Sequence, residues 1–296
     1  MKKRIFTGAG VAIITPMNPD MSVNFDKLKE IIDFQIENGT DAIIICGTTG
    51  EGSTLSDAEH REAIKCAIEH TAKRVPVIAG TVSNDTAYAI SLSKEAEQLG
   101  ADGLLLVTPY YNKTSQRGLI EHYKRIAASV SLPIILYSVQ SRTGVNIAPE
   151  TCYELSKIEN IVAVKEASGN ISQVAKIREL CGDELDVYSG NDDQIVPIMS
   201  LGGIGVISVL SNIMPKETHD ICQLYLDGKV KESADLQLKL LDVANKLFLD
   251  VNPIPVKEAM NLMGMEVGEC RLPLIRMDDA SVAVLKEALQ NVGLVK

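Results

Sequence analysis

Eight short apolar segments, separated by stretches of helical character, constrain the fold of this 296-residue chain more than any other feature. They are rich in Val, Ile and Leu, as strands buried on both faces of a sheet are. The segments cover residues 10–16, 41–47, 75–81, 102–109, 132–139, 161–168, 185–191 and 204–211. Strands that alternate with helices predict a parallel sheet, and eight such units predict a closed (β/α)8 barrel, a TIM barrel.

The stretches between the segments carry helix signals of their own. Ser56 precedes Glu59 at the spacing of a capping box, and Gly39 and Gly100 are placed to end helices. No G-x-G-x-x-G motif opens the first helix, which disfavours a dinucleotide-binding fold. After about residue 215 only helical patterns remain. We therefore expect a catalytic barrel over residues 1–225 and a C-terminal helical domain over residues 226–296.

Charge and composition exclude several kinds of partner. The formal net charge is −10, and no basic tract offsets the repulsion from nucleic acid or an anionic membrane. No apolar run approaches the roughly 20 residues that span a bilayer, and no signal peptide follows the initial MKKR. We expect a cytoplasmic protein. The six cysteines form no CxxC, and the four histidines lack neighbours at metal-ligand spacing, so we expect reduced thiols and no metal site.

Lys165 lies within one of the apolar segments, in VAVKEASGN, where a charged amine is unexpected. By alternation it shares a face with Ala163 and Ala167, whereas Val162 and Val164 are expected to face the helices. It should therefore point into the barrel, where two small neighbours leave room. Burial there favours the neutral amine, which is the form that attacks a carbonyl carbon. A structural salt bridge to a barrel carboxylate is the alternative.

Other polar side chains follow the ends of neighbouring strands, where barrel enzymes bind their substrates. Tyr137 shares the inner face of its strand and could relay protons, or it could be a core tyrosine bonded to backbone. Thr48 and Thr49 lie in the glycine-rich turn GTTGEGS, where they could bind a carboxylate or only stabilise the turn itself. Arg142 could clamp a carboxylate or remain a solvated loop residue. The acidic SGNDD loop after the seventh strand indicates a substrate without phosphate.

GTTGE, TPYYNK, SRTG, VAVKEASGN and YSGND occur in this order, and with them the chain resembles the dihydrodipicolinate synthase family of pyruvate-dependent class I aldolases. The resemblance covers essentially the whole chain. It implies condensation of pyruvate with aspartate semialdehyde in the diaminopimelate route to lysine, without a metal or organic cofactor. It also implies a homotetramer that is a dimer of tight dimers.

The resemblance implies a role for each residue that does chemistry. Lys165 would form a Schiff base with pyruvate. Tyr137, Thr49 and Tyr111 would form a proton relay, in which Tyr111 reaches into the site of a neighbouring subunit.

The resemblance also assigns the substrate contacts. Thr48 and Thr49 would hold the pyruvate carboxylate, Arg142 would bind the carboxylate of aspartate semialdehyde, and the backbones of Gly190 and Ile207 would border pyruvate. N-acetylneuraminate lyases and sugar-acid aldolases resemble the chain at the lysine and tyrosine but usually lack the arginine. A non-catalytic keto-acid-binding barrel is a further alternative, although a binder needs no proton relay.

One departure from the family pattern concerns the loop that carries Arg142. The family commonly reads YNVPSRTG where this chain reads YSVQSRTG, with Ser138 and Gln140. Because loss of the proline frees φ and restores a backbone donor, we expect a less rigid loop.

A second departure concerns feedback by lysine. In inhibited members a glutamate occupies the position of Tyr88, and Gly52 and Asp57 also differ from the inhibited pattern, although His60 and Asn84 match it. A phenol cannot pair with an ammonium as a carboxylate does, so we expect weak or absent inhibition.

Overall fold

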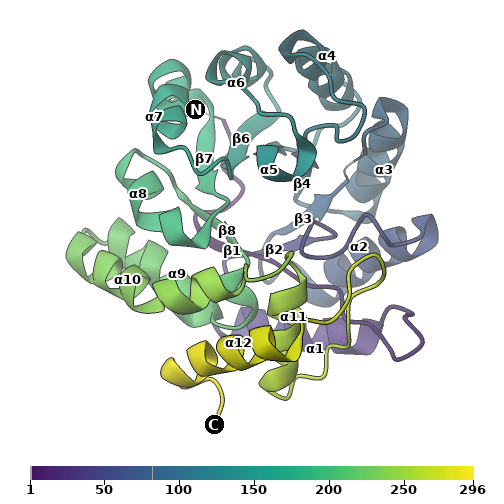
Figure 1. Cartoon of the computed structure of the whole chain (residues 1–296). Coiled ribbons are helices and arrows are strands. Elements are labelled where there is room, and N and C mark those ends of the chain that lie inside the picture. The colour runs from purple at the N-terminus through teal and green to yellow at the C-terminus, as the bar shows by residue number, and fades with distance from the viewer. Residues whose placement is uncertain (1, 82) are drawn as a thin grey trace.

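The computed structural model describes residues 2–81 and 83–296, and its centre is a closed barrel of eight parallel strands (Figure 1). Each strand pairs with its neighbour in the chain, and the last strand pairs with the first. The strands are β1 (Gly8–Ala12), β2 (Ala42–Ile45), β3 (Val77–Gly80), β4 (Gly103–Val107), β5 (Ile134–Ser138), β6 (Ile161–Glu166), β7 (Asp186–Ser189) and β8 (Gly205–Ser208). The predicted (β/α)8 barrel is confirmed. The observed strands are shorter than the apolar segments because the residues at the segment ends form the turns at the rims.

Helices surround the barrel in the order that the sequence predicts (Figure 1). The outer helices are α1 (Phe25–Glu37), α2 (Asp57–Thr71), α3 (Thr86–Leu99), α4 (Gln116–Ala127), α6 (Pro149–Ser156), α7 (Ile171–Cys181), α8 (Ile195–Ser200) and α9 (Pro215–Leu226). Shorter helical turns occur at α5 (Gln140–Thr143), η1 (Gly182–Glu184), η2 (Asp192–Gln194) and η3 (Leu210–Asn212). Three further helices follow the barrel: α10 (Val230–Lys246), α11 (Ile254–Leu262) and α12 (Asp279–Asn291).

The predicted helix ends are present. The Ser56 hydroxyl accepts the N–H of Glu59, and the Glu59 carboxylate accepts the N–H of Ser56 at 2.9 Å, which completes the capping box of α2. Gly100 ends α3 with φ of 93°, a left-handed conformation that costs glycine little. These caps set where each helix starts and stops around the barrel.

Two apolar layers hold the barrel together, and one prediction about them is wrong. Ala163 and Tyr137 belong to the cluster inside the barrel, whereas Val164 packs in the outer layer under the helices. Val162 was expected to face the helices but lies in the interior cluster. The register between β5 and β6 shifts between Ile134 and Ile135, so simple alternation fails at the start of β6.

The C-terminal helices contact both the barrel and each other. Helix α9 ends at Leu226, next to the predicted boundary, and α10 packs against α9 and α12. The division into residues 1–225 and 226–296 stays a prediction. All six cysteines are buried and free, as expected. Among the described residues, no helix is long and apolar enough to cross a membrane, and no cluster of three potential metal ligands occurs.

Candidate active site

The carboxyl ends of β5 and β6 place a tyrosine against a buried lysine. Tyr137 and Lys165 are paired across the two strands, and the Lys165 Nζ atom lies 4.4 Å from the centre of the Tyr137 ring. The side chains are 7% and 5% exposed. Lys257, another buried lysine, has a carboxylate partner, but Lys165 has none among the described residues. The salt-bridge alternative for Lys165 therefore finds no support.

Small residues leave space around the Lys165 side chain. A Cβ atom on Gly190 would lie 3.2 Å from Lys165 Cε and 2.6 Å from Ala167 Cβ, so a larger residue at this position would collide. Ile207 on β8 belongs to the same interior cluster as Tyr137. Both positions are compatible with the predicted border of the substrate, which stays a prediction.

Thr49 and Arg142 are joined by a residue that the sequence analysis missed. Asn252 precedes α11 and donates from Nδ2 to Thr49 Oγ1 at 3.0 Å. Its backbone carbonyl accepts a hydrogen bond from Arg142 Nη2, also at 3.0 Å. Arg142 is thus held at the rim although it is exposed, and is not a freely solvated loop residue. Only the proline-marked break in NPIPVKEAM pointed to this segment.

A second missed contact fastens the turn that carries the two threonines. Glu51 of that turn forms a buried ion pair with Lys257 on α11, at 2.7 Å. Glu51 also accepts the backbone N–H of Arg271 at 2.9 Å. Lys257 is a charged residue in an otherwise apolar helix start, and that pattern could have marked it as buried and paired.

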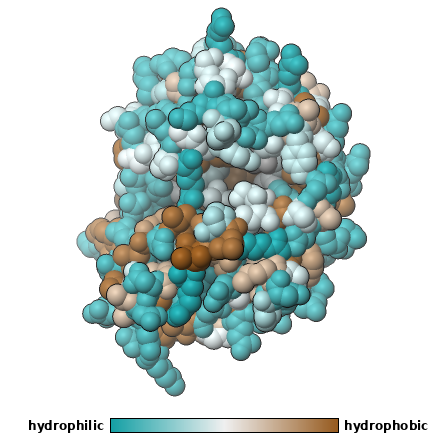
Figure 2. All heavy atoms as spheres, turned by 45° about the vertical axis from the view of Figure 1, so that its right-hand side comes forward, coloured by the Kyte–Doolittle hydropathy of each residue, from teal (hydrophilic) through white to brown (hydrophobic). Residues whose placement is uncertain are grey.

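Part of this rim borders a cavity of about 400 Å³, a size that suits a small metabolite, although Lys165 and Thr49 are not among its lining residues. Thr48, Tyr137 and Arg142 line it, together with Cys46, Gly47, Gly52, Ser53, Leu55, His60, Gly80, Ser83, Tyr88, Leu105, Val107, Tyr110, Val139 and Thr143. Figure 2 shows a hollow in the middle of the face it presents, with apolar side chains along its lower edge. The walls therefore combine apolar surface with a cation and several hydroxyl groups.

Tyr111 does not join the other predicted relay residues within the chain. Its side chain is 92% exposed, and its φ of 67° is a left-handed conformation that is uncommon for a tyrosine. The neighbouring Tyr110 lines the cavity instead. A relay role for Tyr111 therefore requires a second copy of the chain.

The side chain of Tyr88 is already hydrogen-bonded within the chain. The Tyr88 hydroxyl donates to the Asp57 carboxylate, which also accepts from Arg61 Nε at 2.9 Å. Burial, and then this hydrogen bond, raise the pKa of Tyr88. His60 lies nearby on the cavity wall, and its Nε2 is 2.8 Å from the Gly80 carbonyl. Burial lowers the pKa of His60, which favours the neutral ring.

The buried carboxyl group of Asp192 interacts with the charge of Lys165. Asp192 accepts the N–H groups of Val209 and Leu210 at 3.1 and 2.9 Å, and burial raises its pKa while these bonds and the Lys165 charge oppose the rise. Burial also raises the pKa of Glu166, which follows Lys165 in β6. The absence of phosphate from the substrate stays a prediction.

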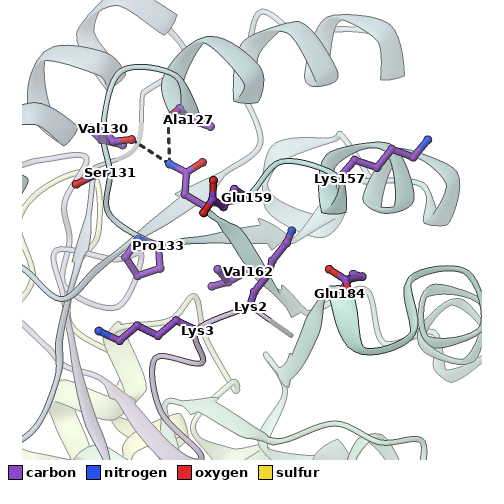
Figure 3. A pocket seen from close by; sticks show the side chains of 11 residues that line it. Lys2, Lys3, Ala127, Val130, Ser131, Pro133, Lys157, Glu159, Val162 and Glu184 are labelled. Carbon is purple, nitrogen blue, oxygen red and sulfur yellow. Dashed lines mark hydrogen bonds between the residues drawn. The ribbon is translucent and has the colours of Figure 1, made fainter.

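A second cavity, of about 810 Å³, lies at the other end of the barrel and is shown in Figure 3. Val162 and Pro133, at the start of β6 and before β5, line it with Lys2 and Lys3. The Lys2 amine donates to the carbonyls of residues 156, 158 and 161. Catalytic groups of this fold gather at the carboxyl ends of the strands, so size alone does not make this cavity the active site.

The family model described as the dihydrodipicolinate synthetase family matches residues 5–292. The chain belongs to this family. A 4-hydroxy-tetrahydrodipicolinate synthase from Lachnoclostridium phytofermentans is 61% identical over 292 residues, 98% of this chain and 99% of the relative. An enzyme of the same name from Acetivibrio thermocellus is 58% identical over 295 residues, covering 100% of both chains.

Solved structures of the dihydrodipicolinate synthetase family are similar over nearly the whole chain. The dihydrodipicolinate synthase from Aquifex aeolicus has 43% identity and a TM-score of 0.95, covering 98% of this chain and 99% of that one. DHDPS from Cyanidioschyzon merolae, solved with lysine bound, has 38% identity and a TM-score of 0.96, with 99% and 100% covered. The resemblance identified from the motifs is confirmed.

Proposed function

We propose that this chain is a 4-hydroxy-tetrahydrodipicolinate synthase, a lyase that condenses pyruvate with L-aspartate 4-semialdehyde in lysine biosynthesis. The observation that carries the proposal is the Lys165–Tyr137 pair at the catalytic rim, with the amine 4.4 Å from the ring centre. A buried amine that forms no salt bridge with the described residues can attack a carbonyl, and an adjacent phenol can carry protons for that reaction. The relatives of this name support the choice of substrates.

The first stage forms a covalent bond to pyruvate. Lys165 Nζ attacks the keto carbon and gives a carbinolamine, which loses water to become an iminium ion. Tyr137 gives a proton to the hydroxyl group that leaves as water and regains one from Thr49, which is resupplied by Tyr111 of a neighbouring copy. Thr48 and the N–H groups of the glycine-rich turn hold the carboxylate.

The second stage joins the two substrates. Loss of a methyl proton converts the iminium ion into an enamine, whose carbon attacks the aldehyde carbon of aspartate semialdehyde. Arg142 binds the carboxylate of that substrate, because a guanidinium fork matches a carboxylate in two places. The substrate's own amino group then displaces Lys165 from the imine carbon and closes the ring. Gly190 and Ile207 border pyruvate through both stages.

The proposal extends to the assembly of the protein, its cellular location and its need for a cofactor. The exposed Tyr111 supports a tight dimer in which each copy completes the other's relay, and we propose a tetramer of two such dimers in the cytoplasm. The lysine adduct makes a metal or organic cofactor unnecessary for the carbon chemistry proposed here.

The test follows condensation and cleavage side by side. The purified protein is assayed with pyruvate and aspartate semialdehyde, and separately with N-acetylneuraminate. The proposal expects turnover only in the first assay, and Arg142→Ala should raise KM for the semialdehyde more than KM for pyruvate. Turnover of N-acetylneuraminate alone would overturn the proposal in favour of a sugar-acid lyase.

A further inference from the structure

Asn252 bridges two parts of the proposed site from a segment distant in sequence. Its side chain is buried, at 5% exposed, and its Nδ2 atom is 3.0 Å from Thr49 Oγ1. Its backbone carbonyl accepts a hydrogen bond from Arg142 Nη2 at the same distance. The side chain and the backbone thus serve different partners, so they can be separated by substitution.

The chemistry of the amide sets the direction of the Thr49 hydrogen bond. A primary amide nitrogen donates and does not accept, so Thr49 Oγ1 must be the acceptor. The hydroxyl hydrogen of Thr49 therefore has to point to another acceptor. Among the described residues it donates to none, which leaves it free for Tyr137 or for a bound carboxylate.

The other end of the amide shows that Asn252 is not optimised for stability. Its Oδ1 atom is buried and has no hydrogen-bond partner among the described residues, an arrangement that costs stability. Asn261, in the last turn of α11, bonds at both ends: Oδ1 accepts the N–H of Val267 at 2.8 Å and Nδ2 donates to the Gly268 carbonyl at 2.9 Å. An asparagine with a purely structural role is expected to form hydrogen bonds at both ends of its amide, as Asn261 does. At Asn252 the donor is retained while the acceptor is left unsatisfied.

We propose that Asn252 is a positioning residue of the Schiff-base reaction, holding the Thr49 hydroxyl so that its hydrogen points along the proton relay. The inference rests on the proposed function of Lys165 and Tyr137. When the carbinolamine loses water, Tyr137 gives a proton to the leaving hydroxyl group and regains one from Thr49. A hydroxyl already oriented for this transfer has no reorientation to make during the reaction.

Asn252→Asp tests the proposal, because it replaces the donor with an oxygen of the same shape that accepts instead. The backbone carbonyl that holds Arg142 is unchanged. We expect kcat to fall at least about tenfold, a part of what proton transfer contributes, while KM for the semialdehyde changes little. Asn261→Asp is the matched control, since it makes the same exchange nine residues along the chain, in the last turn of α11 and away from the site. It should leave kcat at the wild-type value.

A double-mutant cycle with Thr49→Val separates positioning from a general structural effect. If Asn252 acts through Thr49, Asn252→Asp should lower kcat in the wild-type background and not in the Thr49→Val background. Asn252→Ala, which removes the donor without adding a charge, supplies the same comparison if the aspartate variant does not fold. An equal loss in both backgrounds, or no loss in either, overturns the inference. Borohydride trapping of pyruvate by the wild type is scored separately, so failure of the proposed function is distinguished.

Discussion

The Lys257 amine lies 2.7 Å from a carboxylate oxygen of Glu51, and the two side chains are 2% and 1% exposed. Glu51 belongs to the turn that carries Thr48 and Thr49, whereas Lys257 lies on α11 in the C-terminal helices. The Lys257 amine also donates to the Glu269 carbonyl at 2.8 Å. The C-terminal helices are therefore fastened to the catalytic rim.

Breaking this ion pair should be costly. Lys257→Met leaves the Glu51 carboxylate buried without its counter-charge, and we expect the free energy of unfolding to fall by about 3–5 kcal/mol. Lys231→Met is the matched control, because the Lys231–Asp235 pair is exposed and should change stability by less than about 1 kcal/mol. Urea unfolding of both variants measures the difference. Equal stability of the two variants would contradict the account.

Acid should weaken the fold partly through Glu59. The hydrogen bond from the Arg271 guanidinium, with the bonds from Ser56, holds the pKa of Glu59 at about 2 despite partial burial. A carboxyl group whose pKa is lowered by folding stabilises the protein above its unfolded pKa of about 4.3, and this stability disappears as pH falls through the folded pKa.

Glu59→Gln is the variant that measures this contribution, because glutamine keeps the capping-box geometry. At pH 6 the free energy of unfolding of the wild type should exceed that of Glu59→Gln by about 2 kcal/mol, with the partial exposure of the Glu59–Arg271 pair taken into account. The difference should shrink between about pH 5 and pH 2 in a urea-unfolding series. A difference that stays constant with pH would show that the charge of Glu59 is not responsible.

Lysine should inhibit this enzyme weakly or not at all. The Tyr88 hydroxyl is committed to Asp57, and it offers no carboxylate to an incoming ammonium group. Initial rates measured against increasing L-lysine should stay flat through the micromolar range, and Tyr88→Glu should increase the sensitivity. Half-inhibition of the wild type at micromolar lysine would contradict this expectation.

Restoring a proline at position 140 should stabilise the Arg142 loop. Gln140 is the first residue of α5, a position that favours proline, and its N–H donates no backbone hydrogen bond among the described residues. Gln140→Pro should therefore raise the free energy of unfolding by roughly 0.4–1 kcal/mol with activity retained. Gln140→Ala keeps the backbone donor and serves as the control. A less stable proline variant would show that the loop has a different conformation in solution.

The strands and the central lysine could be predicted from sequence because their signals are local. Alternation along one strand places Lys165 with Ala163 and Ala167, and the fold rule brings Tyr137 to the same rim. Alternation was wrong for Val162, since the register shift beside it depends on how two strands pair. A single sequence contains no direct signal for that shift.

The links to the C-terminal helices could not be predicted for a related reason. Asn252 and Thr49 are 203 residues apart, and their contact exists only after the barrel has closed and the last helices have packed. The predicted role of Tyr111 cannot be judged from one chain, because its exposed side chain could join a relay only in a second copy. Local patterns therefore identified the lysine and tyrosine, whereas their supporting contacts required the structure.

Covalent trapping of pyruvate tests the central claim most directly. The protein is incubated with pyruvate, reduced with borohydride, digested and analysed by mass spectrometry. We predict a reduced pyruvyl adduct on the peptide that contains Lys165, none on the peptide that contains the buried Lys257, and no adduct in Lys165→Ala. Absence of any adduct in the wild type, or an adduct that persists in Lys165→Ala, would contradict the account.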